Sequence, residues 1–104
     1  MLIFRDYEDR PIRLSGERMA HILSHPEMAG PSGDIGGVLA EPEVVVSSRR
    51  DVSVRLHYRR IRSTLVGEKL LCVVVKVVAE DAFVLTAYLT DRIKRGTKLW
   101  PTGE

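Results

Sequence analysis

The apolar positions of the chain change their period once. Met19, Ile22 and Leu23 recur at spacings of three and four, which is typical of one face of a helix. Ser15 can cap such a helix, because its side-chain oxygen can accept a backbone N–H of the first turn. Pro26 ends it, because the residue before a proline is biased away from helical backbone angles. The pattern therefore predicts a helix between Ser15 and Pro26.

A shorter helical signal follows in a glycine-rich stretch. Ile35, Val38 and Leu39 have helical spacing behind Asp34, which suits the position before the first helical residue. Pro42 closes this segment. We therefore expect a short second helix before residue 42.

Beyond residue 42 the apolar residues alternate with polar ones, as they do in half-buried strands. Four runs are predicted as strands, at residues 44–48, 52–59, 69–79 and 83–90. The third run is apolar on both faces, which is typical of a central strand. Short turns join the runs and favour antiparallel neighbours. The expected fold class is α+β, a single domain over residues 1–104. In it, an N-terminal helix and a short second helix pack on a four-stranded antiparallel sheet.

Composition narrows the class of protein. A chain of 104 residues with 44% hydrophobic and 29% charged residues has the length and make-up of one globular domain, not of a disordered, collagenous or coiled-coil protein. The longest apolar run, residues 70–78, contains Lys76 and is too short to cross a bilayer. Cys72 is the single cysteine, so no internal disulfide can form, and no secretory leader is visible. We expect a cytoplasmic protein with no membrane partner.

The charges are divided unevenly along the chain. Residues 1–48 carry four arginines and eight acidic residues, whereas residues 49–104 carry twelve lysines and arginines and six acidic residues. The basic residues gather at 49–62 and at 92–98. Two clusters of one sign predict a polyanionic partner, although a solvated basic surface explains them equally well.

Polar residues alternate with apolar ones in two of the predicted strands. We expect the helix to cover the apolar residues at alternate positions of these strands, Val54, Leu56 and Tyr58 among them. The opposite face would then carry Arg55, His57, Arg59, Thr86, Tyr88 and Thr90, with Lys76 between them if the registers agree.

These residue types are the ones a metal-free ribonuclease needs. Attack by the RNA 2′-hydroxyl requires a base, an acid for the departing 5′ oxygen, and a cation for the charge that grows on the phosphoryl oxygens. Histidine titrates near neutrality and suits the first two roles, whereas arginine and lysine suit the third. Tyrosine can stack on a base or donate a proton, and threonine can bond phosphate. An ordinary solvent-facing sheet would also be rich in threonine, tyrosine and arginine.

Three short motifs carry a family resemblance. They are SGERMAHILSHPE at 15–27, CVVVK at 72–76 and VLTAYLTDRIKRGTKLW at 84–100. Over about residues 12–100 the chain resembles the small phage and bacterial proteins of the barnase/EndoU/colicin/RelE-like nuclease superfamily. The resemblance implies a helix-plus-antiparallel-sheet fold and metal-independent cleavage of RNA, of the kind found in toxin–antitoxin pairs. Two positions depart from its pattern, Met19 in place of a large aromatic residue and Leu89 in place of a frequent proline.

The resemblance also implies the site residues. The matching catalytic positions are His21, His25, Thr86, Tyr88 and Lys94, with Lys76 as a weaker match. On physical grounds we add Arg55, His57 and Arg59 to Lys76 as an RNA-binding group. A helix on one sheet face cannot easily bring its histidines to the other face. Either the histidines meet the remaining residues at a sheet edge, or only one of them is functional. His25, beside Pro26, is favoured over His21, and the alternation around His57 makes it a third candidate base.

A metal site is a further interpretation of the two helix histidines. His21 and His25 have the spacing of two zinc ligands, but Ile22 stands where a metalloprotease helix has glutamate, and no cysteine pair completes a site. We therefore predict neither a metal nor a cofactor. The alternative function is a non-catalytic module of the same fold that binds RNA or a protein. RNA is the expected partner, and a cognate antitoxin or inhibitor protein is the further one.

Overall fold

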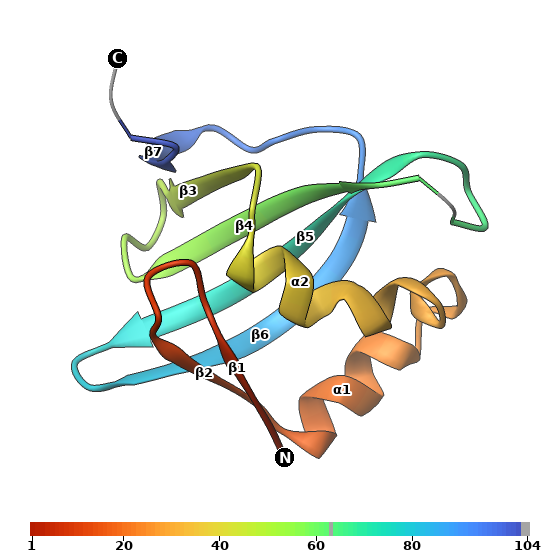
Figure 1. Ribbon diagram of the computed structural model, residues 1–104, viewed down its shortest axis with the longest axis horizontal. Helices are drawn as coiled ribbons and strands as arrows, with labels where there is room; N and C mark the ends of the chain where they lie inside the picture. Colours follow the sequence, from red (N-terminus) through yellow and green to blue (C-terminus); the bar gives the residue numbers. More distant parts are fainter. Residues whose placement is uncertain (63, 103–104) are drawn as a thin grey trace.

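The computed structural model describes residues 1–62 and 64–102, which form a seven-stranded mixed sheet with its helices on one face (Figure 1). The strands are β1 (Leu2–Arg5), β2 (Pro11–Leu14), β3 (Val44–Ser48), β4 (Val54–Ile61), β5 (Lys69–Val78), β6 (Asp81–Thr90) and β7 (Gly96–Trp100). The helical segments are α1 (Gly16–Leu23), the short 3₁₀ turns η1 (Pro26–Met28) and η2 (Pro31–Asp34), and α2 (Ile35–Ala40). Across the sheet the strand order is β1-β2-β6-β5-β4-β3-β7.

The expected four-stranded antiparallel sheet is wrong. The four predicted runs do form β3, β4, β5 and β6, and consecutive strands among them pair antiparallel. The sheet continues beyond them on both sides: β2 joins β6 in parallel, β1 extends the sheet past β2, and β7 pairs with β3. These three added strands are only four or five residues long, and two of them are edge strands. Such short runs carry few alternations, and they lack the run of valines that marks the equally short β3.

The helix predicted after Ser15 is present as α1. The Ser15 hydroxyl accepts the backbone N–H of Arg18 at 3.1 Å, and the helix ends before Pro26. Ile22, on its apolar stripe, is fully buried against the sheet. Both α-helices are short, eight residues in α1 and six in α2. In the two stretches that the structure describes, no helix has the length and apolarity needed to cross a membrane.

Strand register decides which side chains share a face of the sheet. His57 of β4 lies opposite Val73 of β5, which lies opposite Ala87 of β6, so these three side chains point the same way. Val73 and Ala87 belong to the core under the helices, and this side is called the helix-covered face. One residue along, Tyr58, Cys72 and Tyr88 are opposite one another. They belong to the other side, called the opposite face.

The expected distribution of polar residues over the two faces is therefore wrong. Arg55, His57 and Arg59 lie on the helix-covered face, whereas Thr86 and Tyr88 lie on the opposite face. A strand that alternates polar and apolar residues can turn either set inward, and packing against the rest of the chain makes the choice.

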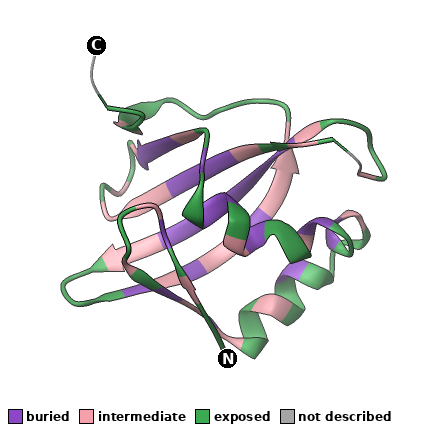
Figure 2. Cartoon of the chain, in the orientation of Figure 1, coloured by how far each residue is buried: buried purple, intermediate pink, exposed green. Residues whose placement is uncertain are grey.

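A second core fills the opposite face. Its buried members are Val46, Leu56, Tyr58, Leu70, Cys72 and Val74. The chain between β6 and β7 crosses one end of the sheet on its way to β3 (Figure 1). There the backbone N–H of Lys94 donates to the Tyr58 hydroxyl at 3.0 Å. Burial thus follows the middle strands on both faces, as the purple segments of Figure 2 show.

Gly96 permits the close approach of β7 to β3. A Cβ at this position would overlap the backbone carbonyl oxygen of Ser47 and the side chain of Val46. We therefore expect Gly96→Ala to lower the free energy of unfolding by about 2 kcal/mol, the usual cost of forcing atoms into a packed site. Urea denaturation followed by circular dichroism measures the change. Gly37→Ala is the matched control, because a Cβ there meets open space.

Candidate nucleic-acid site

His57 is sealed inside the protein. Only 1% of its surface is exposed, and Nδ1 lies 3.3 Å from the carbonyl oxygen of Val73. A carbonyl only accepts, so Nδ1 carries the proton, and Nε2 has no hydrogen-bond partner. Desolvation by burial lowers the pKa of His57 to about 4, although the bond to Val73 acts in the other direction. In this position His57 cannot touch an RNA strand.

The turn between β1 and β2 covers His57. Oδ1 of Asp6 accepts the backbone N–H groups of Glu8 and Arg10, at 2.9 and 2.8 Å, and so holds the turn in shape. The Tyr7 ring lies edge-on to His57, with 6.0 Å between ring centroids. The Trp100 ring of β7 also lies against the Tyr7 ring, with 5.4 Å between ring centroids.

The two arginines of β4 that were predicted to bind RNA also contact the surrounding chain. The Arg55 guanidinium donates to the Glu8 carboxylate at 3.1 Å, and the Arg59 guanidinium donates to the backbone carbonyl of Glu41. Lys76, predicted to join them, lies on the opposite face and donates to Asp51 at 2.6 Å. The predicted RNA-binding group is therefore divided between two faces, with its charged groups already engaged.

Three of the predicted catalytic residues do come together on the opposite face. Thr86 and Tyr88 are half-buried neighbours along β6, and the Lys94 ammonium lies 5.8 Å from the centroid of the Tyr88 ring. The Tyr88 hydroxyl oxygen is buried and has no hydrogen-bond partner. Desolvation raises the pKa of Tyr88, so the phenol stays protonated. The half-buried Tyr88 ring thus lies beneath the Lys94 ammonium, while its hydroxyl points inward.

The two histidines of the predicted set lie on or just after α1, the helix that packs against β6. His21 on α1 and His25 just after it are exposed, and their rings meet edge-to-face with 6.0 Å between centroids. Helix α1 packs against β6. Within residues 1–62 and 64–102, β2 pairs with β6 only at Phe83, so the rest of that edge faces α1 without a strand partner.

One polar contact joins α1 to this edge of β6. Leu85 is an extra residue in the β6 pairing, because Val74 lies opposite Thr86 and the next residue of β5 lies opposite Val84. The Leu85 carbonyl faces outward at this bulge and accepts from the Arg18 guanidinium at 3.5 Å. A depression of about 240 Å³ beside it is lined by Glu17, Arg18 and His21. Of the predicted catalytic residues, only His21 lines this depression.

A larger depression of about 410 Å³ lies where β3 ends and β7 begins. Its lining is Ser48, Arg49, Arg50, Lys94 and Arg95, and we call it the basic pocket. Sequence reasoning found both charge clusters but not their meeting, which depends on the β3–β7 pairing.

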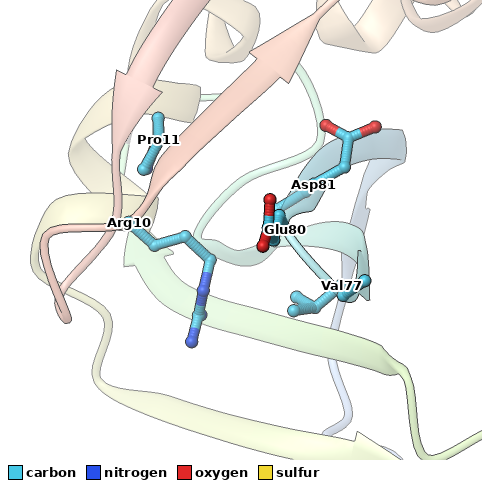
Figure 3. Close-up of a pocket in the computed structure, with 7 residues that line it drawn as sticks. Arg10, Pro11, Val77, Glu80 and Asp81 are labelled. Carbon is cyan, nitrogen blue, oxygen red and sulfur yellow. The ribbon is translucent and has the colours of Figure 1, made fainter.

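A third depression is lined by one basic and two acidic residues. It has a volume of about 130 Å³ and lies between β2 and the β5–β6 turn, as Figure 3 shows. Arg10 at its rim pairs with Asp6 at 3.0 Å, and Asp81 pairs with Arg13 at 2.6 Å. Arg10 and Asp81 are thus paired within the chain, whereas Glu80 forms no ion pair among the described residues. The depression therefore does not gather positive charge that could hold a phosphate.

The remaining signals add no further site. Among the described residues, no three histidine, cysteine or acidic side chains lie close enough to hold a metal ion. Cys72 is buried, and desolvation raises its pKa to about 11, so the thiol is neutral. No family model matches this chain, and neither a curated protein nor a solved structure is significantly similar to it. The nuclease resemblance therefore stays a hypothesis that rests on its sequence motifs.

Proposed function

We propose that this protein is a metal-independent ribonuclease that acts at the edge of β6 beside α1. One observation carries the proposal: β6 borders both groups of residues that the chemistry requires. The exposed His21 and His25 lie on its α1 side, and Thr86, Tyr88 and Lys94 lie on or above its opposite face. RNA bound over this edge would meet imidazoles from one side and an ammonium from the other.

The reaction assigns a role to each group. One imidazole takes the proton of the 2′-hydroxyl as its oxygen attacks phosphorus, and the other protonates the 5′ oxygen as the P–O5′ bond breaks. The products are a 2′,3′-cyclic phosphate and a free 5′-hydroxyl. Lys94 stabilises the charge on the phosphoryl oxygens. The Tyr88 ring provides a stacking surface for a base, and the Thr86 hydroxyl a hydrogen bond to phosphate.

The proposed compartment is the cytoplasm, because the one thiol, Cys72, is free and buried. The proposed substrate is single-stranded RNA, because the bases of an unpaired strand are free to stack on an aromatic ring.

A cleavage assay in excess EDTA tests the proposal. The substrate is an unstructured, end-labelled RNA of about twelve nucleotides, compared with the same sequence fully 2′-O-methylated. We expect only the unmodified RNA to be cut, with a cyclic phosphate on the 5′ product by mass spectrometry. Cleavage of the methylated strand, or cleavage only with a divalent ion, would show that the proposed reaction is wrong.

The alternative is a module that binds RNA without cutting it. The inward-pointing Tyr88 hydroxyl favours this alternative, because it removes one proton donor from the solvent-facing surface. Binding of the unmodified RNA, with no products after long incubation of the folded protein, would support it.

A further inference from the structure

The basic pocket joins two chain segments that are far apart in sequence. Ser48, Arg49 and Arg50 follow β3, and Lys94 and Arg95 precede β7. The antiparallel pairing of Ser48 with Gly96 holds the two segments together. The position of the pocket therefore follows from the sheet itself.

The positive charges of this pocket are not balanced within the protein. In residues 1–62 and 64–102, none of its four cationic side chains forms an ion pair, and no acidic residue lines it. The two nearest acids in sequence are engaged elsewhere, Asp51 with Lys76 at 2.6 Å and Asp91 with Lys69 at 2.9 Å. Four like charges around one depression repel one another, and a bound anion would relieve that repulsion.

Lys94 belongs both to this pocket and to the candidate site. Its side chain lines the pocket, and its ammonium lies 5.8 Å from the centroid of the Tyr88 ring. Its backbone is held by the bond to Tyr58 at 3.0 Å. A strand whose phosphates occupy the pocket could therefore place a neighbouring base over Tyr88.

We propose that the basic pocket binds backbone phosphates of single-stranded RNA next to the nucleotide at the β6 edge. This inference rests on the proposed function and adds the site that holds the strand. Arginine suits the task, because its planar guanidinium can bond two phosphate oxygens at once. Alternating phosphates and bases match a cationic pocket placed beside an aromatic ring.

Fluorescence anisotropy with the 2′-O-methylated RNA tests the inference. This strand keeps the phosphates but cannot be cut, so binding is measured apart from cleavage. For the triple variant Arg49→Ala/Arg50→Ala/Arg95→Ala we expect binding at least about 10-fold weaker, because three phosphate contacts are lost. The slope of log K against log salt should fall in magnitude by about 2, at about 0.7 for each contact with a single strand.

A charge-matched variant controls for the general loss of positive charge. Arg5→Ala/Arg62→Ala/Lys98→Ala removes three exposed cations that do not line the pocket. We expect its salt slope to stay within 0.5 of the wild-type value, taking roughly one contact as the resolution of the method. If the two triple variants bind equally, the inference is overturned. If thermal denaturation shows that the first variant is unfolded, the double variant Arg49→Ala/Arg50→Ala, confined to an exposed turn, takes its place, with an expected fall in slope of about 1.4.

The remaining outcomes separate this inference from the proposed function. A salt-sensitive loss of binding in the pocket variant, with no cleavage by the wild type, would support the pocket and overturn the ribonuclease. Cleavage that needs His21 and His25, with binding unchanged in the pocket variant, would support the ribonuclease and overturn the pocket. Polyglutamate serves as the competitor: displacement of RNA by equal or lower concentrations of polyglutamate would show that the pocket prefers an acidic protein.

Discussion

Replacement of both His21 and His25 by alanine is expected to lower the rate of RNA cleavage by about 10²- to 10⁴-fold, the range typical for loss of a general acid or base. Both side chains are exposed beside β6, and they are the only solvent-accessible histidines in the described chain. Their removal takes away the base that receives the 2′ proton and the acid that supplies the 5′ oxygen. Single-turnover cleavage of the unmodified RNA in EDTA measures the effect.

The single variants distinguish the two histidines. We expect His25→Ala to reduce the rate more than His21→Ala, because His25 follows the end of α1 and is less confined by the helix. Thermal denaturation should be unchanged in each, since neither side chain is buried. Wild-type rates in the double variant would place the proton transfers elsewhere and refute the assignment.

Lys94 allows a comparison at constant charge. Lys94→Ala should slow cleavage, whereas Lys98→Ala removes the same charge from exposed β7, away from Tyr88 and the pocket lining. Equal rates in the two variants would show that Lys94 acts only through the overall charge of the protein.

Acidification is expected to destabilise the protein by about 3 kcal/mol through His57 alone. The pKa of His57 is about 4 in the folded protein, against an ordinary value of 6.5. Between these values the unfolded chain takes up a proton that the folded chain does not. The free energy of unfolding is therefore highest above pH 6.5 and falls as the pH drops toward 4. Urea denaturation at intervals between pH 7 and 4 measures the loss.

A variant without this imidazole isolates its contribution. His57→Leu should be less stable at pH 7, because the bond to the Val73 carbonyl is lost, but its stability should change less between pH 6.5 and 4. The variant lacking His21 and His25 keeps His57 and should lose stability over that range as the wild type does. Asp51 falls outside the window, because its hydrogen bond from Lys76 lowers its pKa to about 2. A wild-type stability that is flat from pH 6.5 to 4 would contradict the prediction.

Local signals in the sequence were enough to locate α1 and the four middle strands. Ser15 and Pro26 bound the helix through contacts within a few residues of themselves, and the alternation in β4 and β6 reflects burial on one side of a strand. The charge clusters at 49–62 and 92–98 are also visible without a structure. Strands β2 and β7 were missed, and residues 1–4 were left open between a short edge strand and a disordered start. Pairing with distant strands, rather than a pattern of their own, gives β1, β2 and β7 their form.

The sequence by itself determined the order of the main elements, the N-terminal helix with its histidines, and the basic character of the second half. Only the tertiary structure decided that His57 is buried under Tyr7, that Tyr88 turns its ring toward Lys94, and that Arg50 and Arg95 line one pocket. The physical reason is the separation along the chain of the residues that interact. Helix ends and alternation depend on neighbours in the chain, whereas the inward face of a strand and the meeting of two turns depend on packing between distant segments.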